Sequence, residues 1–157
     1  MVIRVKLHDI IEGLEFQSDE SSSFLNTKTG EVILMTDYAM QAAEDDEPLE
    51  ELPDWERDLV AIAGEILAET GQYIPLPTKY DIDEYSIMEN FCMSMDKQEI
   101  GDILYDLISG SGAFRRFKDA IYKYSVEEEW FKYRDNAIKE IAIEWCREHN
   151  IEFDTIE

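Results

Sequence analysis

Apolar residues recur at helical spacing through most of the second half of the chain, and this pattern constrains the fold more than any other feature. From Asp54 onward a stripe of apolar residues continues toward Gly71, a residue type that favours a helix end. The stripe consists of Trp55, Leu59, Ile62, Ala63, Ile66 and Leu67. A longer stripe follows between Glu127 and His149, and a shorter one begins at Ile3. These segments predict an α+β fold that is predominantly α-helical, with about six helices packed with one β-hairpin.

The hairpin is predicted between Ser23 and Met35. Two short runs, Ser23–Asn26 and Glu31–Met35, flank the segment Thr27–Gly30, whose glycine can adopt the positive φ of a turn. Because two strands alone are only marginally stable in water, helices must cover the hairpin or another strand must pair with it. A homo-oligomer is one possibility, in which a second copy of the chain pairs a strand with the edge of the hairpin.

The length of 157 residues allows one domain with a sizeable core. We predict a single domain over residues 1–157, with a helix and the β-hairpin in 1–36, an acidic connection in 37–53 and a helical region in 54–150. The connection is rich in Asp and Glu, and Pro48 and Pro53 interrupt it. It is predicted as a solvated surface segment after a short helix at Tyr38–Ala43.

The formal net charge of −23 predicts repulsion from nucleic-acid phosphates and anionic lipid, and it favours basic partners. No apolar run approaches the roughly 18 residues of a membrane span, and charged residues near the N-terminus interrupt any signal-peptide pattern. Cys92 and Cys146 lie among apolar residues, where a free thiol behaves as a small hydrophobic group. We therefore expect an acidic, cytoplasmic protein that avoids membranes and does not rely on a disulfide.

Against this acidic background, half of the 14 Lys and Arg residues lie between Arg115 and Lys139. A predicted helix starts at Gly112 and carries the adjacent pair Arg115 and Arg116 on its outside. Its apolar spacing assigns four residues to a buried face: Phe114, Phe117, Ile121 and Tyr124. Paired arginines after a glycine-rich helix start fit carboxylate or phosphate groups. The alternative is that these cations only balance the carboxylates elsewhere in the fold.

Arg134 falls on the apolar stripe of the last helix, where side chains should face the core. A buried arginine needs a carboxylate partner, since a lone buried charge costs several kcal/mol. The candidate partners are Asp81, Asp83 and Asp119. Two interpretations stay open: Arg134 forms a structural ion pair, or it lines a pocket whose other wall is Tyr73 and the turn at 81–85.

Catalytic motifs are absent from the sequence. It contains no nucleophile elbow, P-loop, dinucleotide-binding motif, zinc-hydrolase motif or Cys-x-x-Cys pair. His8 and His149 lie near opposite ends of the chain, and a carboxylate pair carries little specificity for Mg²⁺ in so acidic a sequence. We therefore predict no catalytic residue, no metal site and no cofactor. The candidates for binding a ligand or partner are Tyr73, Asp81, Asp83, Arg115, Arg116 and Arg134.

Four segments after residue 70 form a recognisable set with the hairpin motif at 26–32. They are 73–77, 81–89, 112–119 and 130–135, and the most specific of them is GAFRRFKD at Gly112–Asp119. Through these segments the chain resembles, over nearly its whole length, a bacterial family catalogued only as an uncharacterised protein family, UPF0158. The resemblance implies a bacterial cytoplasmic setting, and it brings no activity, substrate or cofactor.

Three functions follow as hypotheses. The leading one is a non-enzymatic interaction or regulatory protein whose partner is another protein, because catalytic motifs are missing and basic residues are concentrated in one segment. The second is nucleic-acid or nucleotide binding through segment 112–123, against which the net charge argues. The third is a small hydrolase that uses Asp81, Asp83 and Arg134.

Overall fold

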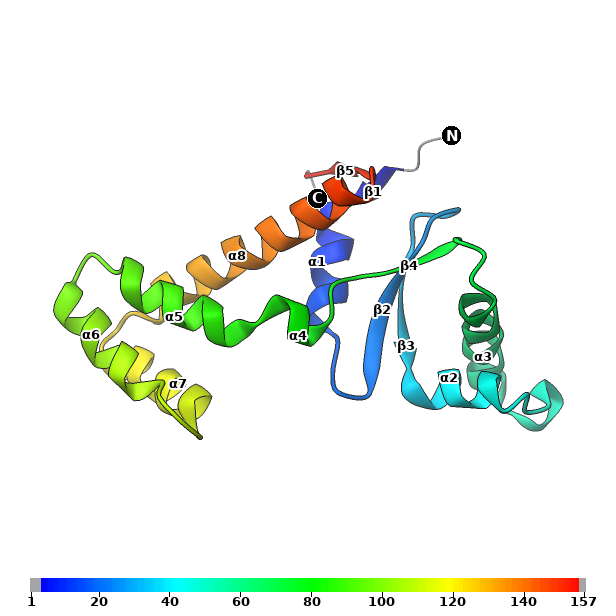
Figure 1. The fold of residues 1–157 in the computed structure, drawn as a ribbon, viewed down its shortest axis with the longest axis horizontal. Coiled ribbons are helices and arrows are strands. Elements are labelled where there is room, and N and C mark those ends of the chain that lie inside the picture. Colours follow the sequence, from blue (N-terminus) through cyan, green and yellow to red (C-terminus); the bar gives the residue numbers. More distant parts are fainter. Residues whose placement is uncertain (1–3, 156–157) are drawn as a thin grey trace. The chain divides into compact units, whose positions relative to one another are not determined.

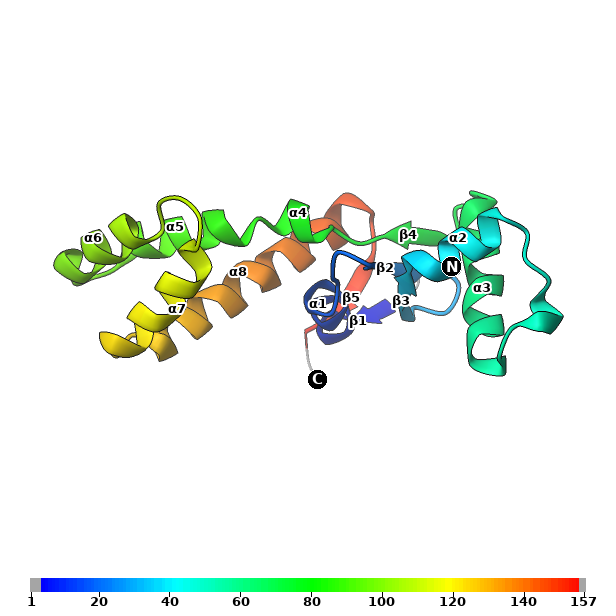
Figure 2. The ribbon, with the colours of Figure 1, turned by 90° about the horizontal axis from the view of Figure 1, so that it is seen from below.

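The computed structural model describes residues 4–155, and Figures 1 and 2 show its ribbon from two sides. The fold is α+β and mainly helical, which confirms the predicted class. The chain divides into two compact units, which are described separately: unit 1 is Met1–Asp81 with Ile141–Glu157, and unit 2 is Ile82–Glu140. The single domain expected over 1–157 stays a prediction. Ile3, which the apolar pattern assigned to the first helix, lies outside the described residues.

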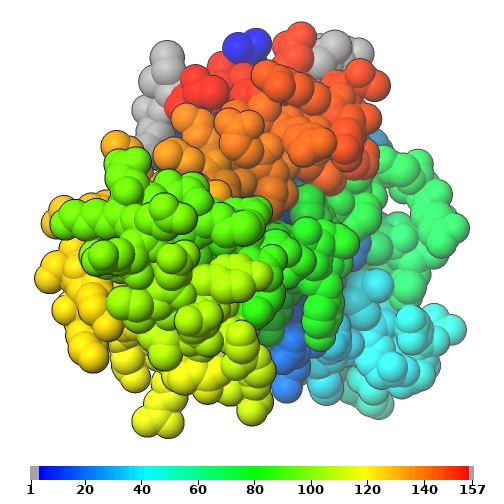
Figure 3. Space-filling view, turned by 60° about the vertical axis from the view of Figure 1, so that its left-hand side comes forward, coloured from blue at the N-terminus to red at the C-terminus, as the bar shows by residue number. Residues whose placement is uncertain are grey.

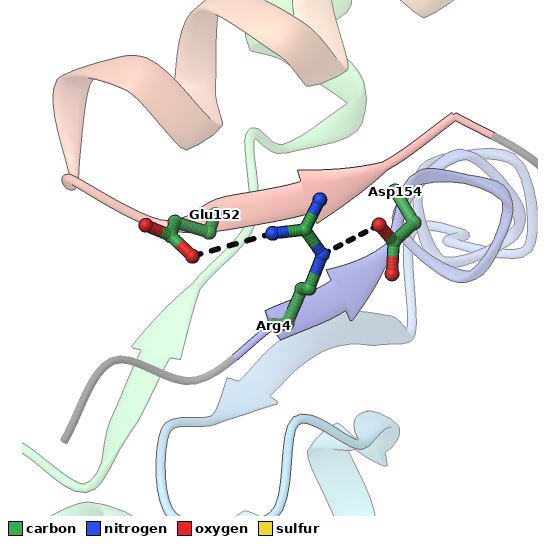
Figure 4. Close-up of polar contacts among 3 residues, drawn as sticks. All are labelled: Arg4, Glu152 and Asp154. Atoms are coloured by element: carbon green, nitrogen blue, oxygen red, sulfur yellow. Dashed lines mark hydrogen bonds and ion pairs between the residues drawn. The ribbon is translucent and has the colours of Figure 1, made fainter.

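Unit 1 begins with a strand that pairs with the C-terminal tail. Strand β1 (Arg4–Lys6) runs parallel to β5 (Glu152–Asp154). The guanidinium of Arg4 bridges two carboxylates of β5, with Nε 2.5 Å from Asp154 Oδ1 and Nη1 3.4 Å from Glu152 Oε2 (Figure 4). The first helix, α1 (Leu7–Glu15), therefore starts later than the apolar pattern predicts, because the preceding residues are held in a strand.

The predicted hairpin is confirmed as β2 (Ser21–Asn26) and β3 (Val32–Thr36). A third strand, β4 (Tyr73–Pro75), pairs antiparallel with β2, so that the order of the sheet is β3-β2-β4 (Figure 1). The chain itself therefore supplies the strand that the hairpin was expected to need, and β3 lies at one edge. Pairing of that edge with a second copy stays a prediction.

Helix α1 packs on the face of the sheet that carries Ser23 and Val32. The helix approaches closely at Gly13, where an added Cβ would lie 2.7 Å from Val32 Cγ1 and 2.9 Å from Leu76 Cδ2. The opposite face meets helices α2 (Asp37–Glu44) and α3 (Asp54–Leu67). Together they form an apolar core of Met35, Ala39, Ala42, Leu52, Val60 and Ala63.

The predicted acidic connection at 37–53 contains α2 and a short 3-10 helix, η1 (Leu49–Glu51). Arg57 fixes its second half by donating hydrogen bonds to the carbonyls of Leu49, Glu50 and Leu52. The following helix begins at Asp54 as expected, but it ends at Leu67, before Gly71. Trp55, which the apolar stripe assigned to the core, is 74% exposed.

Unit 2 consists of helices α5 (Glu84–Ser94), α6 (Gln98–Leu107) and α7 (Ala113–Lys123) with the first part of α8 (Glu127–Glu148), and α4 (Lys79–Ile82) lies at its boundary. Both ribbon views show α7 beside the start of α8 (Figures 1 and 2). Aromatic side chains join these helices. The Phe117 ring lies 4.8 Å from that of Trp130, and the Phe91 ring lies 5.3 Å from Trp130 and 5.4 Å from Tyr133.

Candidate functional site

Arg134 forms an ion pair within unit 2. Its Nε and Nη2 donate to Oε1 of Glu84 at 2.9 and 2.5 Å, and Glu84 was not among the predicted partners. The Arg134 side chain is 26% exposed and that of Glu84 is 40% exposed. The pair is therefore neither sealed in the core nor free in solvent. This geometry supports the interpretation of a structural ion pair between α8 and the first turn of α5.

Asp81 and Asp83 both act at helix starts. Oδ2 of Asp81 accepts from the amide of Thr78 at 2.9 Å, while the amide of Asp81 donates to Oγ1 of Thr78 at 3.2 Å, a reciprocal capping box. Asp83 caps α5 by accepting from the amide and the hydroxyl of Ser86. The hydroxyl bond and then the amide bond lower the pKa of the Asp83 carboxyl. Each carboxylate thus has a local structural task.

Tyr73 lies in β4, and its hydroxyl donates to Oε2 of Glu65 on α3 at 2.9 Å. Partial desolvation and then this bond to a carboxylate raise the pKa of Tyr73. Tyr73 and Asp81 belong to unit 1, whereas Asp83 and Arg134 belong to unit 2. The pocket expected from all four residues stays a prediction. Asp81 instead lines a groove of about 500 Å³ within unit 1, beside Glu144 and Trp145.

Arg116 holds the turn between α6 and α7. Its Nε donates to the carbonyl of Leu107, Nη2 to that of Ser109 and Nη1 to that of Ser111, each at 2.7 Å. The first of these carbonyls belongs to the last residue of α6, where the helix leaves its acceptors without intrahelical donors, and the other two belong to the turn that follows. Gly112 completes the turn with a φ of 81°. The guanidinium of Arg116 is thus engaged by the backbone of its own unit.

Arg115 has a different environment from its neighbour. It is exposed, and within residues 4–155 neither Arg115 nor Lys118 forms an ion pair or a side-chain hydrogen bond. The sequence pattern was wrong about Phe114, which is 53% exposed, while Phe117 and Ile121 are buried as predicted and Tyr124 is half-buried. The first aromatic residue of α7 therefore belongs to the surface.

The outer face of α7 combines aromatic and basic groups. Phe114, Lys118 and Tyr122 are spaced four residues apart, which places them on one stripe of the helix, and Arg115 lies beside it. The rings of Phe114 and Tyr122 are 53% and 52% exposed. The yellow-green to yellow atoms of α7 lie open in the space-filling view (Figure 3). We call Phe114, Arg115, Lys118 and Tyr122 the α7 face. Tyr122 was not predicted as a site residue, because the apolar spacing placed the buried face of this helix on the side of Phe114.

Reactive groups are not gathered elsewhere among the described residues. Cys92 and Cys146 are free and buried, and desolvation raises the pKa of each thiol to about 11, so both stay protonated near pH 7. No group of three or more His, Cys, Asp or Glu side chains within residues 4–155 could hold a metal ion. In the same range, no helix is long and apolar enough to cross a membrane.

The comparisons with known proteins give one match. The model of a family described as "Uncharacterised protein family (UPF0158)" matches residues 1–157. No curated protein and no solved structure matches the chain.

Proposed function

The chain belongs to the Uncharacterised protein family (UPF0158), and from its own surface we propose that it is a non-enzymatic interaction protein that binds an acidic segment of another protein through the α7 face. The observation that carries this proposal is the exposure of Phe114 and Tyr122 beside two cations, Arg115 and Lys118, that have no ion-pair partner within residues 4–155. Interface cores are enriched in aromatic residues and arginine. A bacterial cytoplasmic setting belongs to the same proposal, and the two free, buried cysteines support its reducing compartment.

Charge favours an acidic partner for this face. An exposed cation with no intramolecular partner can pair with a carboxylate without first breaking another contact. The flanking rings supply apolar area, and their few rotatable bonds limit the conformational entropy lost on binding. Arg116 is a weaker candidate than Arg115, because binding a ligand would require it to give up three backbone hydrogen bonds.

The two other hypotheses receive less support. Exposed rings beside cations also fit single-stranded nucleic acid, whose bases stack on aromatic side chains. The net charge of −23 repels any anionic ligand, and it opposes a phosphate backbone with one charge per nucleotide more strongly than a short acidic segment, because the repulsion grows with the charge of the ligand. A hydrolase would need Asp81, Asp83 and Arg134 free to act on a substrate. The first two hold helix starts, and the third is paired with Glu84.

The test measures binding of a fluorescein-labelled decapeptide of alternating Glu and Leu by fluorescence anisotropy at low salt. We expect the double variant Arg115→Glu with Lys118→Glu to weaken binding at least tenfold, because it replaces attraction by repulsion at two positions. The matched control is Lys97→Glu with Lys139→Glu, which changes the net charge equally at two other exposed positions of unit 2. It should leave binding within about twofold.

Equal losses in both double variants would contradict the proposal, because they would show a response to net charge alone. A labelled single-stranded oligonucleotide forms the second arm of the experiment. Tighter binding of the oligonucleotide than of the acidic peptide, abolished by Arg115→Glu with Lys118→Glu, would replace the protein partner with a nucleic acid.

A further inference from the structure

Strand β3 has an open edge in unit 1. Asn26 donates its amide to the carbonyl of Glu31 at 2.8 Å, and Asp37 donates to that of Glu20 at 2.9 Å. Hydrogen-bonded pairs alternate along an antiparallel ladder, so the register between β2 and β3 directs the backbone groups of Val32 and Leu34 away from β2. Within residues 4–155, β3 pairs with no other strand. The amides and carbonyls of Val32 and Leu34 therefore face the edge of the sheet at which no further strand pairs within residues 4–155.

The composition of β3 does not protect this edge. Its five residues are Val-Ile-Leu-Met-Thr, with no charged residue and no proline that would discourage pairing. Leu34, at the centre, is 41% exposed. Natural proteins usually block an apolar edge strand, so an unblocked one indicates a strand that pairs with a partner.

Two hollows lie along β3, and Leu34 lines both. The first, of about 390 Å³, has Asp9, Glu12 and Glu31 in its wall. It also includes Phe16, whose side chain is 66% exposed. No lysine, arginine or histidine lines it.

The second hollow, of about 600 Å³, lies beside the other end of β3 and repeats this composition. Its wall holds Glu20, Asp37 and Glu56 together with Tyr38 and Trp55, and again no basic residue. Tyr38 and Trp55 are 60% and 74% exposed. An open strand edge thus runs between two hollows that both combine carboxylates with exposed aromatic rings.

We propose that the open edge of β3 binds an extended basic segment of a partner protein, which adds to the sheet as a fourth strand. Backbone groups of the segment bond to Val32 and Leu34, and about five residues match the length of β3. Every second side chain of the segment lies on the face of Leu34. Lysine or arginine fits there, because its aliphatic stem covers Leu34 and Trp55 while its charge reaches the carboxylates of the hollows.

Charge distinguishes this occupant from a second copy of the chain. Unit 1 contains 24 Asp and Glu residues and six Lys and Arg residues, so two copies meeting at this edge bring acidic surfaces together. A basic segment meets attraction at the same place. This surface shares no residue with the α7 face, and its ligand is basic whereas the ligand proposed for the α7 face is acidic. The two proposals can therefore be tested independently.

The probe is a labelled decapeptide of alternating Lys and Val. We expect it to bind the full chain at low salt and to shift the emission of Trp55 toward shorter wavelength as this exposed ring is covered. Trp130 and Trp145 are already buried, at 7% and 5% exposure, and should contribute little to the shift. The same peptide with N-methyl groups on one bonding edge keeps its charge and loses its amide donors, so its binding should be at least tenfold weaker.

Two variants probe the strand itself. Leu34→Pro removes an amide that points to the open edge and is not used in the ladder with β2, and Leu34→Lys puts a cation beside the expected cationic ligand. Each should weaken binding at least tenfold. Met93→Lys, at an exposed apolar residue of unit 2, is the control for added charge and should change it by less than twofold.

Three results would overturn the proposal. Equal binding of the methylated and unmethylated peptides would show attraction by charge without strand addition. No binding of the Lys-Val peptide, with circular dichroism showing the chain folded, would remove the basic segment as occupant. A dimer in sedimentation that Leu34→Lys dissociates would assign the edge to a second copy.

Discussion

Arg115 and Arg116 are adjacent, carry the same charge and lie on one helix, yet the structure predicts opposite consequences for their replacement. Arg116 donates to three carbonyls at the end of α6 and in the following turn, whereas the Arg115 side chain forms no hydrogen bond or ion pair within residues 4–155. Replacing each with methionine removes the guanidinium and keeps most of the stem. We expect Arg116→Met to destabilise the protein and Arg115→Met to leave its stability almost unchanged.

The size of the effect follows from the three bonds of Arg116. A hydrogen bond to a charged group contributes about 1.5–3 kcal/mol when water does not compete for it. Only the bond to the carbonyl of Leu107 is partly buried, and water can replace the donors to Ser109 and Ser111. A cation at a helix C-terminus adds about 0.3–1 kcal/mol. The free energy of unfolding should therefore fall by about 2–3 kcal/mol in Arg116→Met.

Urea unfolding followed by circular dichroism measures this difference. The slope of the free energy of unfolding against urea concentration should be the same in both variants, so that the change in the unfolding midpoint reports the change in stability. For Arg115→Met we expect a change within about 0.5 kcal/mol, as for most surface substitutions. Equal changes in the two variants, or less than about 0.5 kcal/mol for Arg116→Met, would refute the reasoning that the three carbonyls hold Arg116.

Further predictions concern backbone conformation, the ion pair and the thiols. Gly112→Ala should lower the free energy of unfolding by about 1–2 kcal/mol because of the positive φ, whereas Gly64→Ala, in open space on α3, should raise it by about 0.5–1 kcal/mol; thermal melts of both variants check this. Arg134→Ala should destabilise by about 1 kcal/mol, less in high salt, since the pair is partly exposed; a loss of 3–5 kcal/mol in urea titrations would mean a buried pair. The pKa of each thiol is about 11 in the folded protein and about 9 in the unfolded chain, so the free energy of unfolding should fall as the pH rises from 9 to 11. Replacing Cys92 and Cys146 with alanine should make the midpoint of urea unfolding less dependent on pH in that range.

Local patterns predicted the elements of this fold well. The hairpin at 23–35 was found from a turn glycine between two strand-like runs, and the start of α3 from its apolar spacing. The pairing of β4 with β2 was not predicted. Pairing between strands about fifty residues apart depends on how the intervening helices pack, and no local pattern contains that information.

Side-chain roles were harder to predict because they depend on tertiary neighbours. The apolar spacing of α7 predicted that Phe114 and Phe117 are both buried, but of the two only Phe117 contacts Phe91 and Trp130. Arg134 was correctly expected to need a carboxylate, but Glu84, which the structure pairs with it, was not among the candidate partners. In both cases the residue types were recognised and their three-dimensional partners were not.

The excess of acidic residues is unevenly distributed, and most of the net negative charge lies in unit 1. Unit 2 contains 13 Asp and Glu residues and eight Lys and Arg residues, whereas unit 1 has 24 and six. The more acidic unit is also the one with the unblocked edge of β3. We expect like charge to oppose pairing of this edge between two copies, as lysine or proline within an edge strand does in other proteins, and to attract the basic segment proposed above. High salt should weaken both effects. We therefore expect self-pairing to be most strongly opposed, and binding of a basic segment to be tightest, at low ionic strength.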